Sequence, residues 1–273
     1  METVATAKRQ FGWALCYTCG YRCSYCGVWK MTYHADTVLD VARWSAAWDR
    51  IFDLYGCCKI FISGGEPSTY PGFFDLIADL SRKHRLEICT NLDWDVARLA
   101  GIADSRNITV SPTFHPLYAD PSAFSDKLAR IKDSLRDVRY LLYPGSFDSY
   151  LAMRDRLRER QVEIFPIPLR MVTDSKILND AEELARIEDS FGANSELLNA
   201  WKYLTFIDSP RGKLCRSGRD FAMIRPDGHV DRCPQIEGSG LGSIFDPGFR
   251  LAAGPSLCES GHCLNPYYLG TVL

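Results

Sequence analysis

The sequence lacks several features that mark common classes of protein. It has no uninterrupted apolar run of the roughly 20 residues that a membrane-spanning helix requires, and residues 1–9 lack the apolar core of a signal peptide. The formal net charge is only −2, which gives no general attraction to the phosphates of nucleic acid. No flavin-binding or nicotinamide-binding motif, internal repeat or low-complexity tract is present. We therefore expect a cytoplasmic protein with no membrane and no nucleic-acid partner.

The composition indicates a globular protein that is rich in thiols. The chain has 273 residues, of which 46% are hydrophobic, enough for one barrel-like domain with a small appendage. It also has 11 cysteines. Because the cytosol keeps thiols reduced, so many cysteines without an export signal indicate metal ligands rather than disulfides.

Three of these cysteines form a compact loop. Cys19, Cys23 and Cys26 lie in Cys-Gly-Tyr-Arg-Cys-Ser-Tyr-Cys, with the aromatic residue Tyr25 directly before the last. A [4Fe–4S] cluster usually takes four cysteine ligands, so three thiols leave one iron open to a ligand that is not protein. The alternative is a structural zinc site, which would need a fourth ligand.

A glycine-rich turn follows a short apolar run about 40 residues downstream: Ser63-Gly64-Gly65-Glu66-Pro67. In its cysteine loop and this turn, the chain resembles the radical S-adenosylmethionine (SAM) superfamily, over at least residues 11–168. The resemblance implies that the methionine end of SAM chelates the open iron and that the turn binds the SAM amino group. It also implies that an electron from the cluster cleaves SAM to a 5′-deoxyadenosyl radical, which abstracts hydrogen from a substrate.

The resemblance implies further contacts with SAM. Tyr25 belongs to the cofactor-binding loop, and Glu66 would add negative charge near the SAM ammonium. Asn91, after a predicted strand, is expected to hydrogen-bond the ribose, and Ser111 matches a position that contacts the SAM carboxylate in related enzymes.

The first 170 residues alternate between short β-rich runs and helical patterns, which predicts an α/β fold with a parallel sheet. Six strands are predicted, at 11–17, 59–63, 86–90, 108–111, 138–142 and 162–167, with helices at 73–84, 121–135 and 147–160. The resemblance implies the same architecture, a partial (β/α)6 TIM barrel open on one side. In such barrels the active site lies at the carboxyl ends of the strands, where the cysteine loop and the turn would both be.

The C-terminal segment carries a second set of cysteines. Cys215 and Cys233 flank a predicted hairpin at residues 222–232 with a Pro-Asp-Gly turn, and Cys258 and Cys263 follow. This pattern resembles the auxiliary-cluster regions called SPASM and twitch domains, and four thiols suit the shorter twitch form with one auxiliary [4Fe–4S] cluster. The spacing from Cys258 to Cys263 departs from that pattern, so His262 is an alternative fourth ligand. A structural zinc or unligated thiols remain open.

The chain accordingly divides into three parts. We expect a radical SAM barrel at 1–170, a connecting segment with a helix near 179–191 at 171–214, and a small Cys-rich, twitch-like auxiliary-cluster domain at 215–273.

Two residues near the predicted active face are candidates for catalysis. His115 could act as a base, or it could merely bond a loop carbonyl. Cys89 could return a hydrogen atom to a substrate radical, which would mark an epimerase.

We expect oxidation of an alcohol in a small polar molecule, a sugar or aminocyclitol, with the auxiliary cluster taking the second electron. The alternative is crosslinking or epimerisation of a ribosomal peptide, although the 18 residues before Cys19 are too few for a leader-binding domain. A third possibility is an iron–sulfur scaffold or redox sensor without SAM cleavage. Either enzyme would need an external reductant such as flavodoxin or ferredoxin.

Overall fold

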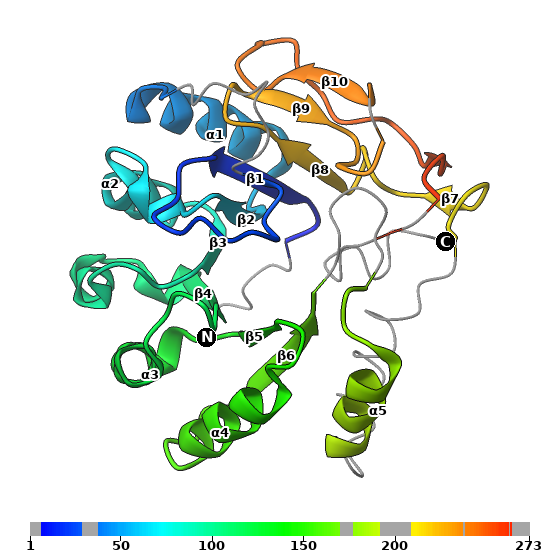
Figure 1. Ribbon diagram of the computed structural model, residues 1–273. Coiled ribbons are helices and arrows are strands. Elements are labelled where there is room, and N and C mark those ends of the chain that lie inside the picture. Colours follow the sequence, from blue (N-terminus) through cyan, green and yellow to red (C-terminus); the bar gives the residue numbers. More distant parts are fainter. Residues whose placement is uncertain are drawn as a thin grey trace.

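A single curved sheet organises the molecule. The computed structural model describes residues 7–28, 38–169, 177–191, 209–236, 238–261 and 263. Nine strands follow the order β10-β9-β8-β1-β2-β3-β4-β5-β6, and β1 to β6 are all parallel. The strands lie along an arc with α1 to α4 on its outer side (Figure 1). This arrangement is an α/β fold consistent with a partial TIM barrel.

The six predicted parallel strands are confirmed. They are β1 (Gln10–Cys16), β2 (Lys59–Gly64), β3 (Arg85–Thr90), β4 (Ile108–Phe114), β5 (Val138–Leu142) and β6 (Ile164–Pro168). The largest difference is β4, which continues three residues beyond its predicted end at Ser111. A proline would interrupt most strands because it cannot donate to a ladder. Here Pro112 ends the pairing with β3, and the pairing with β5 begins at Thr113, so no ladder bond is lost.

Helices cover the outer side of the sheet. They are α1 (Val41–Tyr55), α2 (Phe73–Leu80), α3 (Pro121–Arg130), α4 (Phe147–Arg158) and α5 (Ala181–Ser190). The predicted helices at 73–84, 121–135, 147–160 and 179–191 are confirmed with shorter bounds, whereas α1 was not predicted. Two 3-10 helices, Val96–Gly101 and Ser105–Asn107, take the place of an α-helix between β3 and β4. Within the described residues, no helix has the length and apolar character to cross a membrane.

Helix α1 packs on β1 through large aromatic side chains. The side chain of Asp40 caps the helix by accepting from the Ala42 N–H. Trp44 and Trp48, four residues apart on one face, contact Trp13 of β1 at ring-centroid distances of 4.5 and 5.4 Å. All three side chains are fully buried. This packing fixes β1, and with it the start of the cysteine loop.

The C-terminal segment extends the barrel sheet. Its strands are β7 (Leu214–Cys215), β8 (Phe221–Ile224), β9 (His229–Asp231), β10 (Gly240–Ser243) and β11 (Ser256–Leu257). The predicted hairpin is confirmed as β8 and β9, and the Gly228 N–H donates to the Arg225 carbonyl across its turn. Unexpectedly, β8 pairs in parallel with β1. The hairpin is therefore continuous with the barrel wall rather than part of a spatially separate domain.

A buried histidine between α1 and β2 predicts a pH-dependent stability. The Cys58 N–H donates to His84 Nδ1, and His84 Nε2 bonds the Trp48 carbonyl. Burial lowers the pKa of His84 to about 4. Between this value and the ordinary pKa of about 6.5, the unfolded chain binds a proton at this residue and the folded chain does not. The neutral state of His84 therefore contributes about 3 kcal/mol to the free energy of unfolding, which is present above pH 6.5 and lost as the pH falls toward 4.

The comparison that checks this is urea unfolding of the wild type and His84→Asn under anaerobic conditions at pH 7 and pH 5. Between these values the wild-type free energy of unfolding should fall by about 2 kcal/mol more than that of the variant, which cannot titrate. Equal losses would contradict the assignment.

Candidate active site

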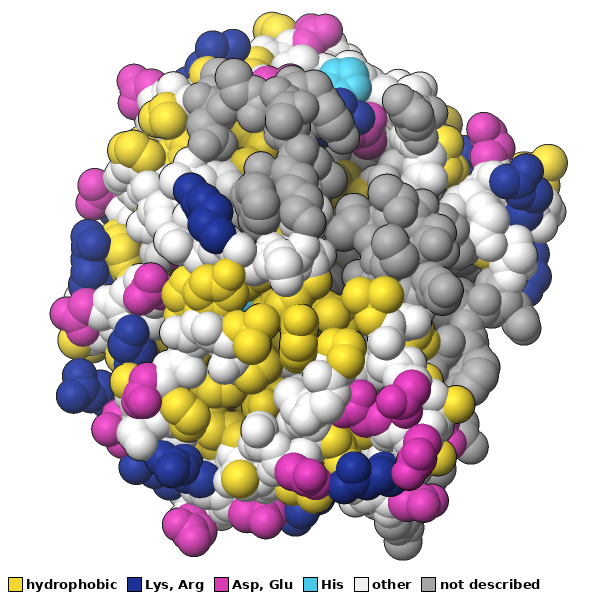
Figure 2. All heavy atoms as spheres, viewed as in Figure 1, with side chains coloured by type: hydrophobic (Ala, Val, Ile, Leu, Met, Phe, Trp, Pro, Cys, Tyr) yellow, Lys and Arg dark blue, Asp and Glu magenta, His cyan; other side chains and the backbone are white. Residues whose placement is uncertain are grey.

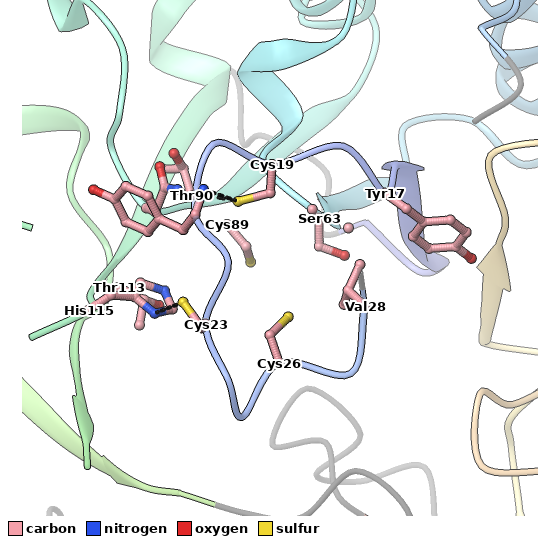
Figure 3. A pocket seen from close by; sticks show the side chains of 14 residues that line it. Tyr17, Cys19, Cys23, Cys26, Val28, Ser63, Cys89, Thr90, Thr113 and His115 are labelled. Atoms are coloured by element: carbon pink, nitrogen blue, oxygen red, sulfur yellow. Dashed lines mark hydrogen bonds between the residues drawn. The ribbon is translucent and has the colours of Figure 1, made fainter. Parts of the chain in front are cut away.

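A cavity of about 190 Å³ opens at the carboxyl ends of β1 to β4. Its wall contains all three thiols of the predicted loop, two glycines of the predicted turn and both candidate catalytic residues (Figure 3). The complete lining is Tyr17, Cys19, Tyr21, Cys23, Cys26, Val28, Ser63, Gly64, Gly65, Cys89, Thr90, Asn91, Thr113 and His115. Motifs up to 96 positions apart in the sequence thus meet around one space.

The glycine-rich turn lies directly against the cysteine loop. The Gly65 N–H donates to the Cys16 carbonyl at 2.7 Å, and the Glu66 N–H donates to the Thr18 carbonyl at 2.8 Å. A Cβ atom on Gly65 would lie 2.1 Å from the Thr18 carbonyl oxygen, so no other residue fits without moving the backbone. Two glycines at this point therefore let the turn and the loop share one cavity wall.

Glu66 holds the turn together and does not line the cavity. Its side chain is 1% exposed, and its carboxylate accepts from the Ser68 N–H and hydroxyl, the Thr90 hydroxyl and the Asn91 N–H. Burial raises the pKa of Glu66, and these hydrogen bonds oppose the rise. The carboxylate that the sequence predicts near the SAM ammonium is thus engaged by protein donors behind the wall. Pro67 is also buried and begins a 3-10 helix, Pro67–Thr69.

Asn91 lies where the sequence predicts a cofactor contact. It lines the cavity, and its Nδ2 lies 3.7 Å from Cys19 Sγ, close enough to donate to sulfur. Its Oδ1 accepts from the Asp93 N–H at 2.9 Å, which fixes the orientation of the amide. Burial raises the pKa of the Cys19 thiol.

Ser111, for which a contact with SAM is predicted, is not among the residues that line the cavity. It is fully buried, and its hydroxyl donates to Glu87 Oε1 at 2.8 Å. Because β4 continues to Phe114, Ser111 lies within the strand rather than at its end. Thr113, two residues further along the same face, supplies the hydroxyl that lines the cavity.

His115 lies among the loop residues. Its Nδ1 is 3.2 Å from the Tyr25 hydroxyl and 3.8 Å from Cys23 Sγ. Burial lowers the pKa of His115 to about 4, so the imidazole is neutral at neutral pH and able to accept a proton. Tyr25 is placed by this contact and by its ring packing with Tyr143, and it does not itself line the cavity.

An aromatic surface continues from the cavity to its mouth. The rings of Tyr21 and Tyr118 are stacked at 5.1 Å, and the Tyr118 hydroxyl donates to the Arg22 carbonyl. Leu117 and Tyr118 are 53% and 43% exposed. Figure 2 shows hydrophobic side chains gathered at the centre of this face, over β4 to β6.

Several lining residues are not among the site residues that the sequence predicts, namely Tyr17, Tyr21, Val28, Ser63, Thr90 and Thr113. Each adjoins a motif that had been recognised. The signal that could have found Thr113 is the two-residue period of the strand that carries Ser111.

The four C-terminal cysteines lie near one another. Cys215 and Cys258 are buried on either side of the short β7–β11 ladder, where the Cys258 N–H donates to the Lys213 carbonyl. Burial, together with the nearby thiols of Cys263, Cys215 and Cys258, raises the pKa of Cys233 to about 11. Of the alternative ligands, His262 lies outside the described residues.

The donor set of the loop fits an iron–sulfur cluster. Within the described residues no group of three or more His, Cys, Asp or Glu is assembled around one point. A [4Fe–4S] cluster takes thiolates spread around a larger body. The loop provides that donor set, since its three thiols surround a cavity that a glycine cradle keeps open.

Several solved structures are similar to the chain. The chain matches the structure of SuiB from Streptococcus suis bound to SAM (14% identity, TM-score 0.59, 89% of this chain and 62% of SuiB). It also matches anSMEcpe with bound SAM (13% identity, TM-score 0.62, 87% and 78%) and BtrN in complex with SAM and 2-DOIA (13% identity, TM-score 0.44, 88% and 79%). The chain thus spans less than two thirds of the length of SuiB.

These structural likenesses concern the fold. Comparison with curated protein sequences gives no match. The family model described as the radical SAM superfamily matches residues 13–184, more than half of the sequence. The chain therefore belongs to the radical SAM superfamily.

Proposed function

We propose that the chain oxidises an alcohol carbon of a small polar molecule, such as a sugar or an aminocyclitol. The observation that carries the proposal is the position of the His115 imidazole in the wall of the cavity that the loop thiols surround. When bound there, a [4Fe–4S] cluster held by Cys19, Cys23 and Cys26 supplies with SAM the 5′-deoxyadenosyl radical that takes the hydrogen atom.

An alcohol that has lost hydrogen from its carbon must still lose a hydroxyl proton and one electron to become a carbonyl. In the tautomer whose Nδ1–H donates to the Tyr25 oxygen, His115 Nε2 accepts the proton. Ser63, Thr113 and Asn91 add uncharged polar side chains to a wall that otherwise consists mainly of aromatic, aliphatic and sulfur-containing groups. These few polar side chains are the ones that would bind the hydroxyl groups of such a substrate.

The remaining electron needs an acceptor, and we propose an auxiliary [4Fe–4S] cluster held by Cys215, Cys233, Cys258 and Cys263. Two observations support it: the electrostatic proximity of these thiols and the β7–β11 ladder, which contains Cys215 and ends directly before Cys258. Arg232 fixes this region, since its guanidinium donates to the carbonyls of Ser217, Ser256 and Leu257. A one-electron donor such as flavodoxin or ferredoxin would start each turnover.

A second candidate is modification of a peptide. One specific observation favours it: Tyr118, which stacks on the cavity-lining Tyr21, and its neighbour Leu117 both have exposed side chains. One of the structures with a similar fold, anSMEcpe, was solved with SAM and the Cp18Cys peptide (15% identity, TM-score 0.60). In this reading Cys89, which lines the cavity, would supply hydrogen for an epimerisation.

The test uses the reconstituted protein with dithionite, SAM and a panel of alcohols deuterated at carbon. We expect deuterium in 5′-deoxyadenosine together with a carbonyl product. His115→Gln should lower carbonyl formation by about 10²-fold while SAM cleavage continues, whereas His229→Gln on the distant hairpin should have no effect.

Three other outcomes would decide against alcohol oxidation. Deuterium transfer only from labelled ribosomal precursor peptides would favour the peptide reading. SAM cleavage without transfer from any alcohol would contradict alcohol oxidation, and a complete lack of SAM cleavage would indicate an iron–sulfur scaffold.

A further inference from the structure

The cavity wall contains a fourth thiol in addition to those of the loop. Cys89, on β3, lines the same cavity as Cys19, Cys23 and Cys26. Figure 3 shows the Cys89 sulfur directed into the space that the three loop sulfurs surround. Four thiols from two separate segments therefore face one volume.

The strand that carries Cys89 holds it rigidly. Its neighbour Ile88 is fully buried on the opposite face of β3, which turns Cys89 toward the barrel interior. The next two residues are tied to the glycine-rich turn, because Thr90 and Asn91 both donate to the Glu66 carboxylate. The position of Cys89 relative to the loop is thus set by backbone and buried contacts, which favours a defined role over incidental exposure.

Thiolate is the ligand that iron–sulfur clusters take from protein, and a loop of three cysteines leaves one iron without such a ligand. We propose that Cys89 is the fourth protein ligand of the loop cluster before SAM arrives, and that SAM binds by displacing it. This inference rests on the proposed function, since it requires a cluster at the loop.

The exchange needs no oxidant or reductant. On a bound cluster, the iron–sulfur bond to Cys89 would break as the amino and carboxylate groups of SAM bind that iron, and the proton that the SAM ammonium loses on binding would pass to the released thiolate. The consequence is a closed, four-thiolate resting state that protects the cluster, and an open state that exists only with SAM. Because the closed state competes with SAM, it lowers the apparent affinity for SAM.

The test compares the full-length wild type with Cys89→Ala and Cys89→Ser, reconstituted anaerobically without SAM and then oxidised with ferricyanide. We expect the wild type to keep its iron, and both variants to lose about one iron per chain and to show the electron paramagnetic resonance signal of a [3Fe–4S] cluster. Cys57→Ala, which removes a half-buried thiol outside the cavity, serves as the control and should behave like the wild type.

A second readout is the SAM concentration that perturbs the spectrum of the reduced cluster, which should be about tenfold lower in Cys89→Ala than in the wild type. Equal iron loss and equal SAM dependence in wild type and variants would overturn the inference. The triple loop variant separates this failure from that of the proposed function. If changing Cys19, Cys23 and Cys26 to alanine removes no iron, the loop holds no cluster and both ideas fail together.

Discussion

Replacing Cys19, Cys23 and Cys26 together with alanine is expected to lower the iron content of the anaerobic protein from about eight atoms per chain to about four, and to abolish SAM cleavage. The three thiols surround the cavity and are the donors that a loop cluster requires. The iron that remains would belong to the C-terminal cysteines. Iron and sulfide analysis of the purified variant, together with assay of 5′-deoxyadenosine, checks both parts.

The matched control is Cys215→Ala/Cys258→Ala, which removes two buried thiols from the β7–β11 ladder. It should lose the other four iron atoms, about half of the total, and should still cleave SAM without completing alcohol oxidation. If the triple loop variant instead contains almost no iron and about one zinc per chain, the C-terminal site is structural. That result would contradict the proposed auxiliary cluster and favour redox-neutral chemistry such as epimerisation.

The strands of the barrel could be predicted because their signal is local. Short β-rich runs bounded by turn residues identify β2 (Lys59–Gly64) and β5 (Val138–Leu142) almost to the residue. The end of β4 was missed because Pro112 normally indicates a strand boundary. Only the switch from one neighbouring strand to the other at this residue makes the proline harmless, and pairing partners cannot be read from sequence.

The attachment of the C-terminal hairpin to the barrel is a long-range feature that local patterns do not carry. The hairpin itself follows from its Pro-Asp-Gly turn, but the pairing of β8 with β1 joins residues about 210 positions apart, as Gln10 and Phe221 show. Gly12 leaves room for the Met223 side chain at this pairing, since a Cβ there would lie 2.7 Å from Met223 Sδ. A single glycine in a strand does not indicate which other strand will pair with it.

The residues of the candidate site also fall into those that local motifs predict and those that depend on long-range contacts. The cysteine loop and the glycine-rich turn are contiguous motifs, so their residues could be identified and later found around one cavity. The role of Glu66 could not be predicted from the sequence, because its partner Asn91 lies 25 residues away and contacts it only through the β2–β3 pairing. A charged residue in a ligand-binding motif suggests contact with the ligand. The Glu66 carboxylate is instead buried and accepts hydrogen bonds from the protein.

Glu66→Ala is expected to destabilise the protein by about 4 kcal/mol, because it leaves buried donors on Ser68, Thr90 and Asn91 without an acceptor. The lost hydrogen bonds join the glycine-rich turn to β3. Without them, Gly64 and Gly65 are no longer held in place as part of the cavity wall. Anaerobic urea unfolding measures the loss of stability. Calorimetric titration with SAM measures the accompanying loss of affinity.

Glu66→Gln should fall between wild type and Glu66→Ala, because its Oε1 can still accept while its amide nitrogen cannot accept from the Asn91 N–H. Glu163→Ala is the matched control, since that carboxylate is exposed, and it should change stability by less than about 0.5 kcal/mol. If Glu66→Ala costs no more than Glu163→Ala but still weakens SAM binding, the carboxylate faces the ligand after all. If Glu66→Ala lowers both stability and SAM affinity, and Glu66→Gln recovers part of each, Glu66 acts through the turn that it holds in place.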